Sequence, residues 1–129
     1  MRIWLFLAGL NGFIATSAGA IGTHMLEGTI SADNLQIYDI AVRYQMWHTL
    51  ALFAVAWLVS RTPKPPQILT LAGAAFFLGI LLFCGSLYFM SLTGSTALVL
   101  VTPAGGIAFL LGWAAMIFAS LTGPVRVLR

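Results

Sequence analysis

Long apolar runs separated by short polar stretches make up most of this chain. A helix needs about 20 apolar residues to cross a bilayer, and four runs approach that length: residues 3–22, 43–60, 68–92 and 102–121. Prolines in the stretch 61–66 and a polar turn at residues 93–96 end the second and third runs. Because lipid does not tolerate open strand edges, the pattern predicts an all-α membrane protein. We expect one integral membrane domain over residues 1–129, a bundle of four transmembrane helices.

The starts of two helices are predicted from local sequence signals and not from the apolar runs. Residues 23–42 form the predicted extracytoplasmic loop, where Ser31 is a good N-cap for a short helix that starts at about Ala32 and runs into the second span. Thr102 and Pro103 favour the start of the fourth helix, with residues 97–101 a buried irregular segment or a short helix. The alternative is a continuous helix from Ala97 that is kinked at Pro103.

Composition supports a membrane location. The 129 residues are 60% hydrophobic and 7% charged, whereas about a quarter of the residues in soluble domains are charged. The net charge of +3 comes from cations at the ends of apolar runs, so it does not indicate a nucleic-acid partner. A secretory signal peptide is the alternative for the first run, but Asn11 and Gly12 interrupt its apolar stretch.

The distribution of charge predicts the orientation. Four spans place the N-terminus, the second loop and the C-terminus on one side, with five cations: Arg2, Arg61, Lys64, Arg126 and Arg129. The other side has one cation and three acids: Arg43, Glu27, Asp33 and Asp39. By the positive-inside rule, both termini should be cytoplasmic.

Small residues form a stripe on the first and on the fourth run. The first stripe contains Ala8, Gly12, Ala15, Gly19 and Gly22, and the second contains Gly105, Ala108, Gly112, Ala115 and Ala119. Such stripes let helices approach closely in lipid. We expect internal packing, in which the two matching stripes satisfy each other. The alternative is a subunit interface.

Polar residues from all four segments fall in the outer half of the predicted bundle. The set comprises His24, Glu27, Arg43, Tyr44, Gln45, His48, Ser86, Tyr88 and Thr102. The inner half holds little beyond Asn11 and Thr70. Because polar side chains in a membrane are costly and usually face partners in the bundle, the sequence predicts a polar cluster there.

His48 and Arg43 each have two interpretations. His48 lies about one turn deeper than Arg43 and is either a functional group or a neutral histidine bonded to a neighbouring helix through Ser86 or Tyr88. Arg43 either belongs to the site or extends to the lipid headgroups beside an aromatic belt of Trp47 and Tyr44.

No cofactor or metal is expected. His24 and His48 lie on the same predicted side, and with Glu27 or Asp39 they offer the alternative of a metal or haem site. Neither histidine has diagnostic spacing, and the single Cys84 lies in an apolar run. We expect Cys84 to be a small buried residue.

Four stretches together resemble a known family. They read GAIGTHML, AVRYQMWHTLAL, LFCGSLYFMSLTG and TPAGGIAFLLGW, and in this order they are similar to the domain of unknown function 423, the YgdD-like small membrane proteins. The resemblance implies a multi-pass protein of the bacterial inner membrane and brings no biochemical activity. It also implies that several residues are family hallmarks: Gly19, Gly22, His24, Tyr44, Gln45, His48, Gly85, Ser86, Leu87, Tyr88, Thr102, Pro103, Gly105 and Gly106.

The function expected from these features is a non-enzymatic accessory or scaffold role, with membrane lipids, a membrane protein or a second copy as partners. The alternative is binding or transport of a small ligand, a lipid headgroup or a proton at the polar cluster. The apolar inner half argues against a continuous water path for ions.

Overall fold

The computed structural model describes residues 1–122, and in this part every regular element is helical. It contains four long rods: α1 (Arg2–Ile21) with a π-helical turn η1 (Gly22–Leu26); α2 (Ala32–Arg61); α3 (Gln67–Gly79), η2 (Ile80–Cys84) and α4 (Gly85–Thr93) in one rod; and α5 (Val101–Leu121). Three rods are long and apolar enough to cross a membrane: Arg2–Leu26, Gln67–Thr93 and Val101–Leu121. The described α2 is not among them, because its first half carries many polar residues.

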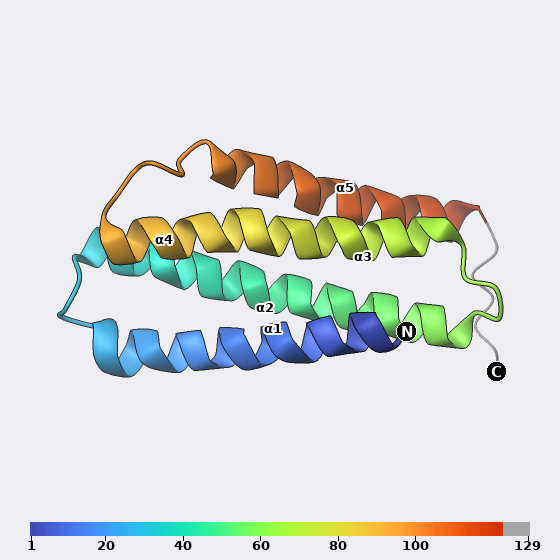
Figure 1. The fold of residues 1–129 in the computed structure, drawn as a ribbon, viewed down its shortest axis with the longest axis horizontal. Helices are drawn as coiled ribbons and strands as arrows, with labels where there is room; N and C mark the ends of the chain where they lie inside the picture. Colours follow the sequence, from blue (N-terminus) through green and yellow to red (C-terminus); the bar gives the residue numbers. More distant parts are fainter. Residues whose placement is uncertain (123–129) are drawn as a thin grey trace.

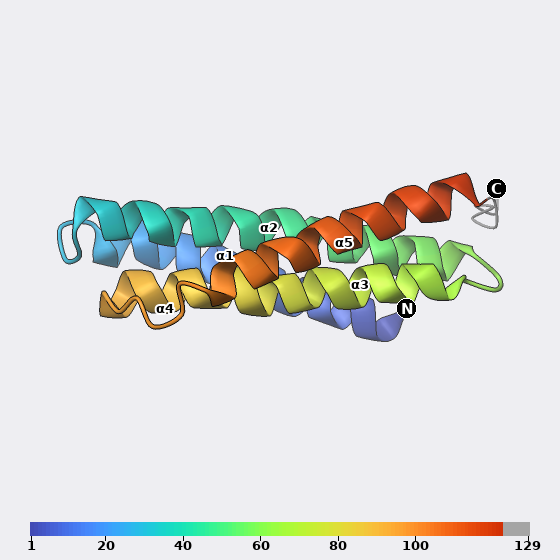
Figure 2. The same ribbon diagram turned by 90° about the horizontal axis from the view of Figure 1, so that it is seen from above.

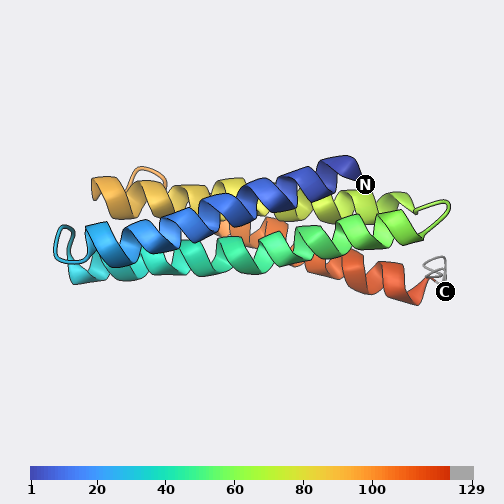
Figure 3. The ribbon, with the colours of Figure 1, turned by 90° about the horizontal axis from the view of Figure 1, so that it is seen from below.

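The rods run antiparallel, and α2 and the α3–α4 rod form the middle pair (Figure 1). One end holds the connections 27–31 and 94–100, and we call it the two-loop end. The one-loop end holds the connection 62–66, the start of α1 and the end of α5. Figure 2 shows α5 crossing the middle pair obliquely, and Figure 3 shows α1 doing so on the opposite side.

Local chemistry explains the helix boundaries. Ser31 caps α2 by accepting a hydrogen bond from the Asn34 backbone N–H at 3.1 Å, and α2 then continues without a break to Arg61. The short helix expected within residues 23–42 is therefore the first part of α2. Gly28 and Gly94 have φ of +80° and +69°, which glycine adopts without steric cost, and they turn the chain at the two-loop end.

The fourth rod starts close to the expected position but not with the expected cap. Leu100 precedes the helix and Val101 begins it, so Thr102 lies within the first turn. Pro103 fits there because the first backbone N–H groups of a helix have no intrahelical partner. The stretch before it is a turn that leaves Leu100 84% exposed, so neither a buried segment nor a continuous helix from Ala97 forms.

The small-residue stripes pack inside the monomer, but not against each other. Gly12 and Gly19 face Thr49 and Val42 of α2, and a Cβ on either would meet those side chains at 3.5 Å. Gly112 faces Phe76 of α3. The expected pairing of the two stripes is wrong, because α1 and α5 lie on opposite sides of the middle pair.

The core lies between the two middle rods. Leu52 and Val55 of α2 and Leu69 and Phe76 of α3 have no exposed surface. The buried polar side chains of α2 lie closer to the two-loop end than this apolar core does, and they form their hydrogen bonds there.

Candidate functional site

A chain of hydrogen bonds links three helices through the side chain of Gln45. The Tyr88 hydroxyl of α4 donates to Gln45 Oε1 at 2.7 Å, and Gln45 Nε2 donates to Asn11 Oδ1 of α1 at 3.1 Å. Asn11 Nδ2 in turn donates to the Leu7 carbonyl at 2.9 Å. In each amide the oxygen accepts a hydrogen bond and the nitrogen donates one, so all the hydrogen bonds run in the same direction along the chain. We call this chain, from Tyr88 to Leu7, the amide relay.

The amide relay is closed to the outside. Asn11 and Gln45 are each 4% exposed. Thr49, one turn along from Gln45, donates to the Gln45 carbonyl at 2.7 Å. Within the described residues, every buried side-chain nitrogen and oxygen has a hydrogen-bond partner. This region therefore offers no polar atom to a ligand without first losing an internal bond.

A second polar contact joins α4 to the start of α5. Ser86 Oγ and Thr102 Oγ1 are 2.6 Å apart, and Ser86 also bonds to the Phe83 carbonyl at 2.9 Å. The side chain of Thr102 therefore bonds across to the neighbouring helix and does not cap its own. This pair fixes the first turn of α5 on the α3–α4 rod.

His48 connects α2 with the middle of α5. Its Nδ1 lies 2.7 Å from the Tyr44 carbonyl, which can only accept, so Nδ1 carries the proton. Its Nε2 accepts from Trp113 Nε1 at 3.2 Å. The imidazole is thus the neutral Nδ1–H tautomer, and the Phe109 ring stacks on it at 3.5 Å between centroids. The partner of His48 is Trp113, not the expected Ser86 or Tyr88.

A groove lies between α2 and α5 beside this histidine. It measures about 700 Å³ and is lined by Tyr44, Trp47, His48, Phe83, Pro103, Gly106, Ile107, Phe109, Leu110 and Trp113. We call it the ring groove, because five of these side chains are Phe, Tyr or Trp rings and a sixth is the imidazole. Trp47 and Leu110 are more than half exposed, so the groove opens sideways from the bundle. The groove therefore has polar side chains in its lining and is open from outside, whereas the amide relay is polar but closed.

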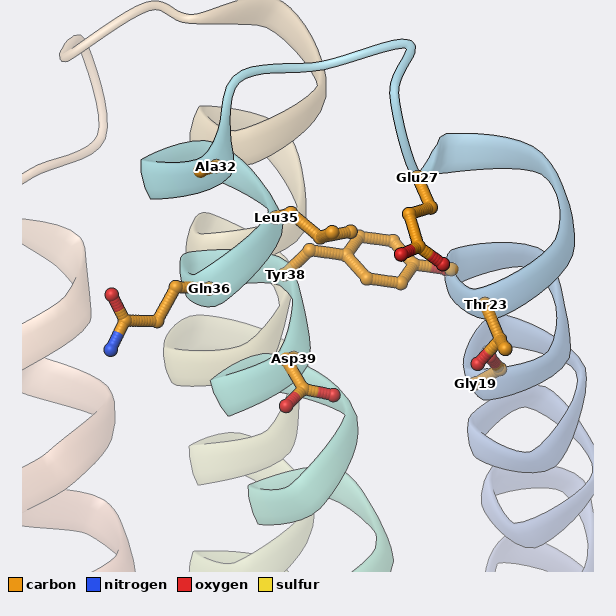
Figure 4. Close-up of a pocket in the computed structure, with 9 residues that line it drawn as sticks. Gly19, Thr23, Glu27, Ala32, Leu35, Gln36, Tyr38 and Asp39 are labelled. Atoms are coloured by element: carbon orange, nitrogen blue, oxygen red, sulfur yellow. The ribbon is translucent and has the colours of Figure 1, made fainter.

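A second cavity lies at the two-loop end, between η1 and the first turns of α2 (Figure 4). It measures about 430 Å³. Tyr38 reaches from α2 toward α1, and its hydroxyl donates to the Ala18 carbonyl. Burial raises the pKa of Tyr38, which keeps the phenol protonated as a donor. Glu27 and Thr23 also line this cavity.

Three residues of the predicted cluster lie outside both the amide relay and the ring groove. Arg43 is exposed and pairs with Asp39 on the same helix at 2.7 Å. His24 and Glu27 are exposed in and just after η1. Arg43 therefore fits the interpretation of a residue at the membrane surface.

The structure does not bring His24 and His48 together. Gly22, two residues before His24, packs on Tyr38 of α2, and His48 lies ten residues farther along that helix, about 15 Å at 1.5 Å per residue. No group of three or more potential metal ligands occurs among the described residues. The arrangement does not support a metal or haem site that uses both histidines.

The sequence prediction did not include one member of the amide relay and one member of the ring groove. Asn11 was assigned to the inner half, yet it bonds to Gln45, and Trp113 was not considered. Asn11 shares a helix face with Ala8 and Ala15 of the small-residue stripe, so its position could have indicated an inward-facing polar group. No comparable signal marks Trp113, because indoles are common in apolar spans.

Together, the apolar rods and their buried polar contacts define a helical integral membrane protein. A family model described as "Protein of unknown function (DUF423)" matches residues 18–106. The chain belongs to this family, as the resemblance of its four motifs implied.

Relatives agree with this assignment. UPF0382 membrane protein YwdK of Bacillus subtilis is 39% identical over 94% of this chain and 98% of the relative. UPF0382 inner membrane protein YgdD of Escherichia coli is 36% identical over 99% and 93%. A UPF0382 membrane protein of Haemophilus influenzae is 38% identical over 91% and 92%. No solved structure matches the chain.

Proposed function

We propose that this chain is a multi-pass protein of the bacterial inner membrane, with four spans and both termini in the cytoplasm. We further propose a non-enzymatic accessory or scaffold role, in which the polar interior holds the helices in one register. The single observation that carries the scaffold role is the closed amide relay. It joins three helices, and within residues 1–122 no buried side-chain nitrogen or oxygen is left unpaired for chemistry.

The surface of α2 supports its role as the fourth span. Four large apolar side chains on this helix are about half exposed: Trp47, Leu50, Phe53 and Trp57. Arg43 and Arg61 bracket them, about 27 Å apart at 1.5 Å per residue, which matches a hydrocarbon core of roughly 30 Å. Between these two arginines, the polar residues Gln45, His48 and Thr49 lower the hydropathy of α2, and they are buried in the bundle instead.

Charge supports the orientation. Among the described residues, Arg2, Arg61 and Lys64 lie at the one-loop end, whereas Glu27, Asp33 and the Asp39–Arg43 pair lie toward the two-loop end. Arg126 and Arg129 lie outside the described residues. The positive-inside rule then puts the one-loop end in the cytoplasm. The inner-membrane location is consistent with the name of the Escherichia coli relative.

Cysteine labelling tests the topology. Cys84 is the only cysteine and is buried, so a Cys84→Ala background can carry single cysteines at Ser31, Lys64 and Ser95. A membrane-impermeant maleimide should label Ser31→Cys and Ser95→Cys in intact spheroplasts, and Lys64→Cys only after permeabilisation. Labelling of Lys64→Cys from outside would contradict the orientation, and equal access at Ser31 and Lys64 would contradict α2 as a span.

Site-specific photo-crosslinking tests the accessory role. A photoreactive residue at Phe13, which is 74% exposed on α1, or at Leu110, on α5, samples the surroundings of the bundle. The same residue at Phe76, which is fully buried, is the matched control. An accessory protein should give a discrete protein adduct from at least one surface position in native membranes. Adducts with lipid alone at both positions would contradict the role.

A further inference from the structure

We propose that the ring groove binds a neutral ring compound of the bilayer that carries ring oxygens, the chemistry of quinones and quinols. This inference goes beyond the scaffold role, but it rests on the proposed four-span topology, which the cysteine labelling above tests separately. It concerns binding only and includes no redox step.

The position of the groove indicates where the ligand comes from. The groove opens to the side of the bundle between α2 and α5, next to exposed apolar side chains such as Ile107 and Leu110. In a four-span topology this surface faces lipid. A ligand must therefore be apolar enough to arrive from within the membrane. The volume of about 700 Å³ lies within the usual range for small-molecule sites.

The walls of the groove favour a flat ring over an acyl chain. Tyr44 lies 4.7 Å from Phe83 and 5.0 Å from Trp47 between ring centroids, and Phe109 and Trp113 complete the aromatic lining. Aromatic pairs stabilise a contact beyond the apolar area that they bury. An acyl chain gains no such term, so the lining discriminates in favour of a planar molecule.

The polar groups of the groove fit ring oxygens. Every buried side-chain oxygen within residues 1–122 is hydrogen-bonded, and the Tyr44 hydroxyl makes no such bond, so it is exposed. It can therefore donate to a carbonyl or accept from a hydroxyl of a ligand. The His48–Trp113 hydrogen bond is long, at 3.2 Å, and it is the one polar contact between side chains of the lining. These groups are all uncharged.

Charge argues against a phospholipid. The lining contains no Lys, Arg, Asp or Glu side chain. Arg43, one residue before Tyr44, is already paired with Asp39. A charged headgroup would therefore find no counter-charge in the groove, whereas an uncharged ring loses nothing by entering it.

Tryptophan fluorescence provides the test, because quinones quench indole emission on contact. In nanodiscs, Trp4→Phe/Trp57→Phe leaves the two indoles of the groove, Trp47 and Trp113, as reporters. The matched variant Trp47→Phe/Trp113→Phe leaves only the two indoles outside it. A short-chain benzoquinone should quench the first protein saturably, and the second only in proportion to its mole fraction in lipid.

Two substitutions in the reporter protein locate the site. Gly106→Leu adds a side chain at the groove, where a Cβ meets only Phe83 at 3.9 Å, and Gly9→Leu adds the same side chain on α1, where a Cβ meets nothing within 4 Å. Gly106→Leu should weaken apparent affinity by roughly tenfold or more, and Gly9→Leu should not change it. Tyr44→Phe should weaken it about threefold to tenfold by removing one hydrogen bond.

Three outcomes would overturn the proposal. The first is quenching in proportion to mole fraction in both tryptophan variants, which indicates partition into lipid only. The second is saturable quenching that survives both Gly106→Leu and Tyr44→Phe. The third is saturable quenching by acyl-brominated phosphatidylcholine with none by the benzoquinone, which would identify a lipid-chain site. If Gly106→Leu does not fold, Tyr44→Phe decides, since it removes only a hydroxyl without a protein partner.

Discussion

The polar side chains on the two faces of α2 differ in how closely neighbouring helices pack around them. Toward α1 and α4, Gln45 sits in the amide relay, where three helices meet and each polar atom is matched. Toward α5, His48 accepts one hydrogen bond from Trp113 and stacks on Phe109, and the ring groove separates most of the two helices. The comparison teaches that polarity inside a membrane bundle fixes helix register only where the helices come close together.

Small residues decide which helices come close. The stripe of α1 is used against α2, through Gly12 and Gly19, and the stripe of α5 is used against η2 and α3, through Gly105 and Gly112. Most of the larger side chains of α5, such as Ile107, Leu110 and Leu111, are exposed, whereas Phe109 is buried against Gly79 of α3. The ring groove is the space that remains because α5 is packed tightly on one side only.

The largest effect is expected from Gly105→Ala, which tests the packed side of α5. A Cβ at this position would lie 2.7 Å from the Phe83 Cα atom, and backbone cannot move aside as a flexible side chain can. We expect a loss of about 3 kcal/mol of stability, measured by thermal unfolding in detergent. Gly106→Ala is the control, since its Cβ meets only Phe83 at 3.9 Å. Equal melting temperatures for the two variants would show that α5 is not tightly packed there.

Gln45→Leu tests the amide relay and should have the next largest effect. It leaves the Tyr88 hydroxyl and Asn11 Oδ1 without partners, which should cost about 2 kcal/mol. The combined variant Asn11→Leu/Gln45→Leu/Tyr88→Phe should recover most of this loss, because no polar atom of the relay then remains unmatched. Gln36→Leu, on the exposed surface of the same helix, is the control. A combined variant less stable than Gln45→Leu would mean that the relay contributes more than matched polarity.

Trp113→Phe tests the side-chain hydrogen bond that joins α5 to α2 across the ring groove. The substitution keeps a ring but removes the donor to His48 Nε2, so we expect a loss of about 1 kcal/mol. Trp57→Phe, on the exposed surface of α2, should change the melting temperature less. If the two variants are equally stable, the imidazole–indole contact does not hold α5 to α2.

The smallest effect is expected from a matched pair of tyrosines, one in each region. Tyr44→Phe removes a hydroxyl without a protein partner and should change stability by less than about 0.5 kcal/mol. Tyr88→Phe removes the donor to Gln45 Oε1 and should cost about 1 kcal/mol. A reversed order of the two melting temperatures would contradict the distinction between the closed and the open side of α2.

Much of the fold could be predicted from the sequence, because apolar runs and proline-rich or polar breaks are local signals. The all-helical class followed from the length of the runs, and the start of α2 followed from Ser31. The pairing of helices could not be predicted. Two stripes of equal spacing are equally compatible with each other and with a third helix, and the choice depends on shapes such as Phe76 against Gly112.

The candidate site could be predicted only as a set of residues, not as contacts. Depth along each run placed Gln45, Tyr88, Ser86 and Thr102 in one set. The structure resolves this set into two hydrogen-bonded pairs, Gln45 with Tyr88 and Ser86 with Thr102. The partners of His48 and of Asn11 depend on the oblique crossing of α5 and α1 (Figures 2 and 3). A crossing angle shifts which residues meet by several positions, and it is set by packing between segments far apart in sequence.

The polar character of α2 has a consequence for biogenesis. In the proposed four-span topology, α2 inserted alone would carry Gln45, His48 and Thr49 into hydrocarbon, where each unpaired polar group costs free energy. Gln45 can form its hydrogen bond with Asn11 of α1 first, because α1 is synthesised before α2. We therefore expect α1 and α2 to enter the membrane together as a helical hairpin. The contacts of the α1 glycines with α2 should then form before either helix meets the acyl chains.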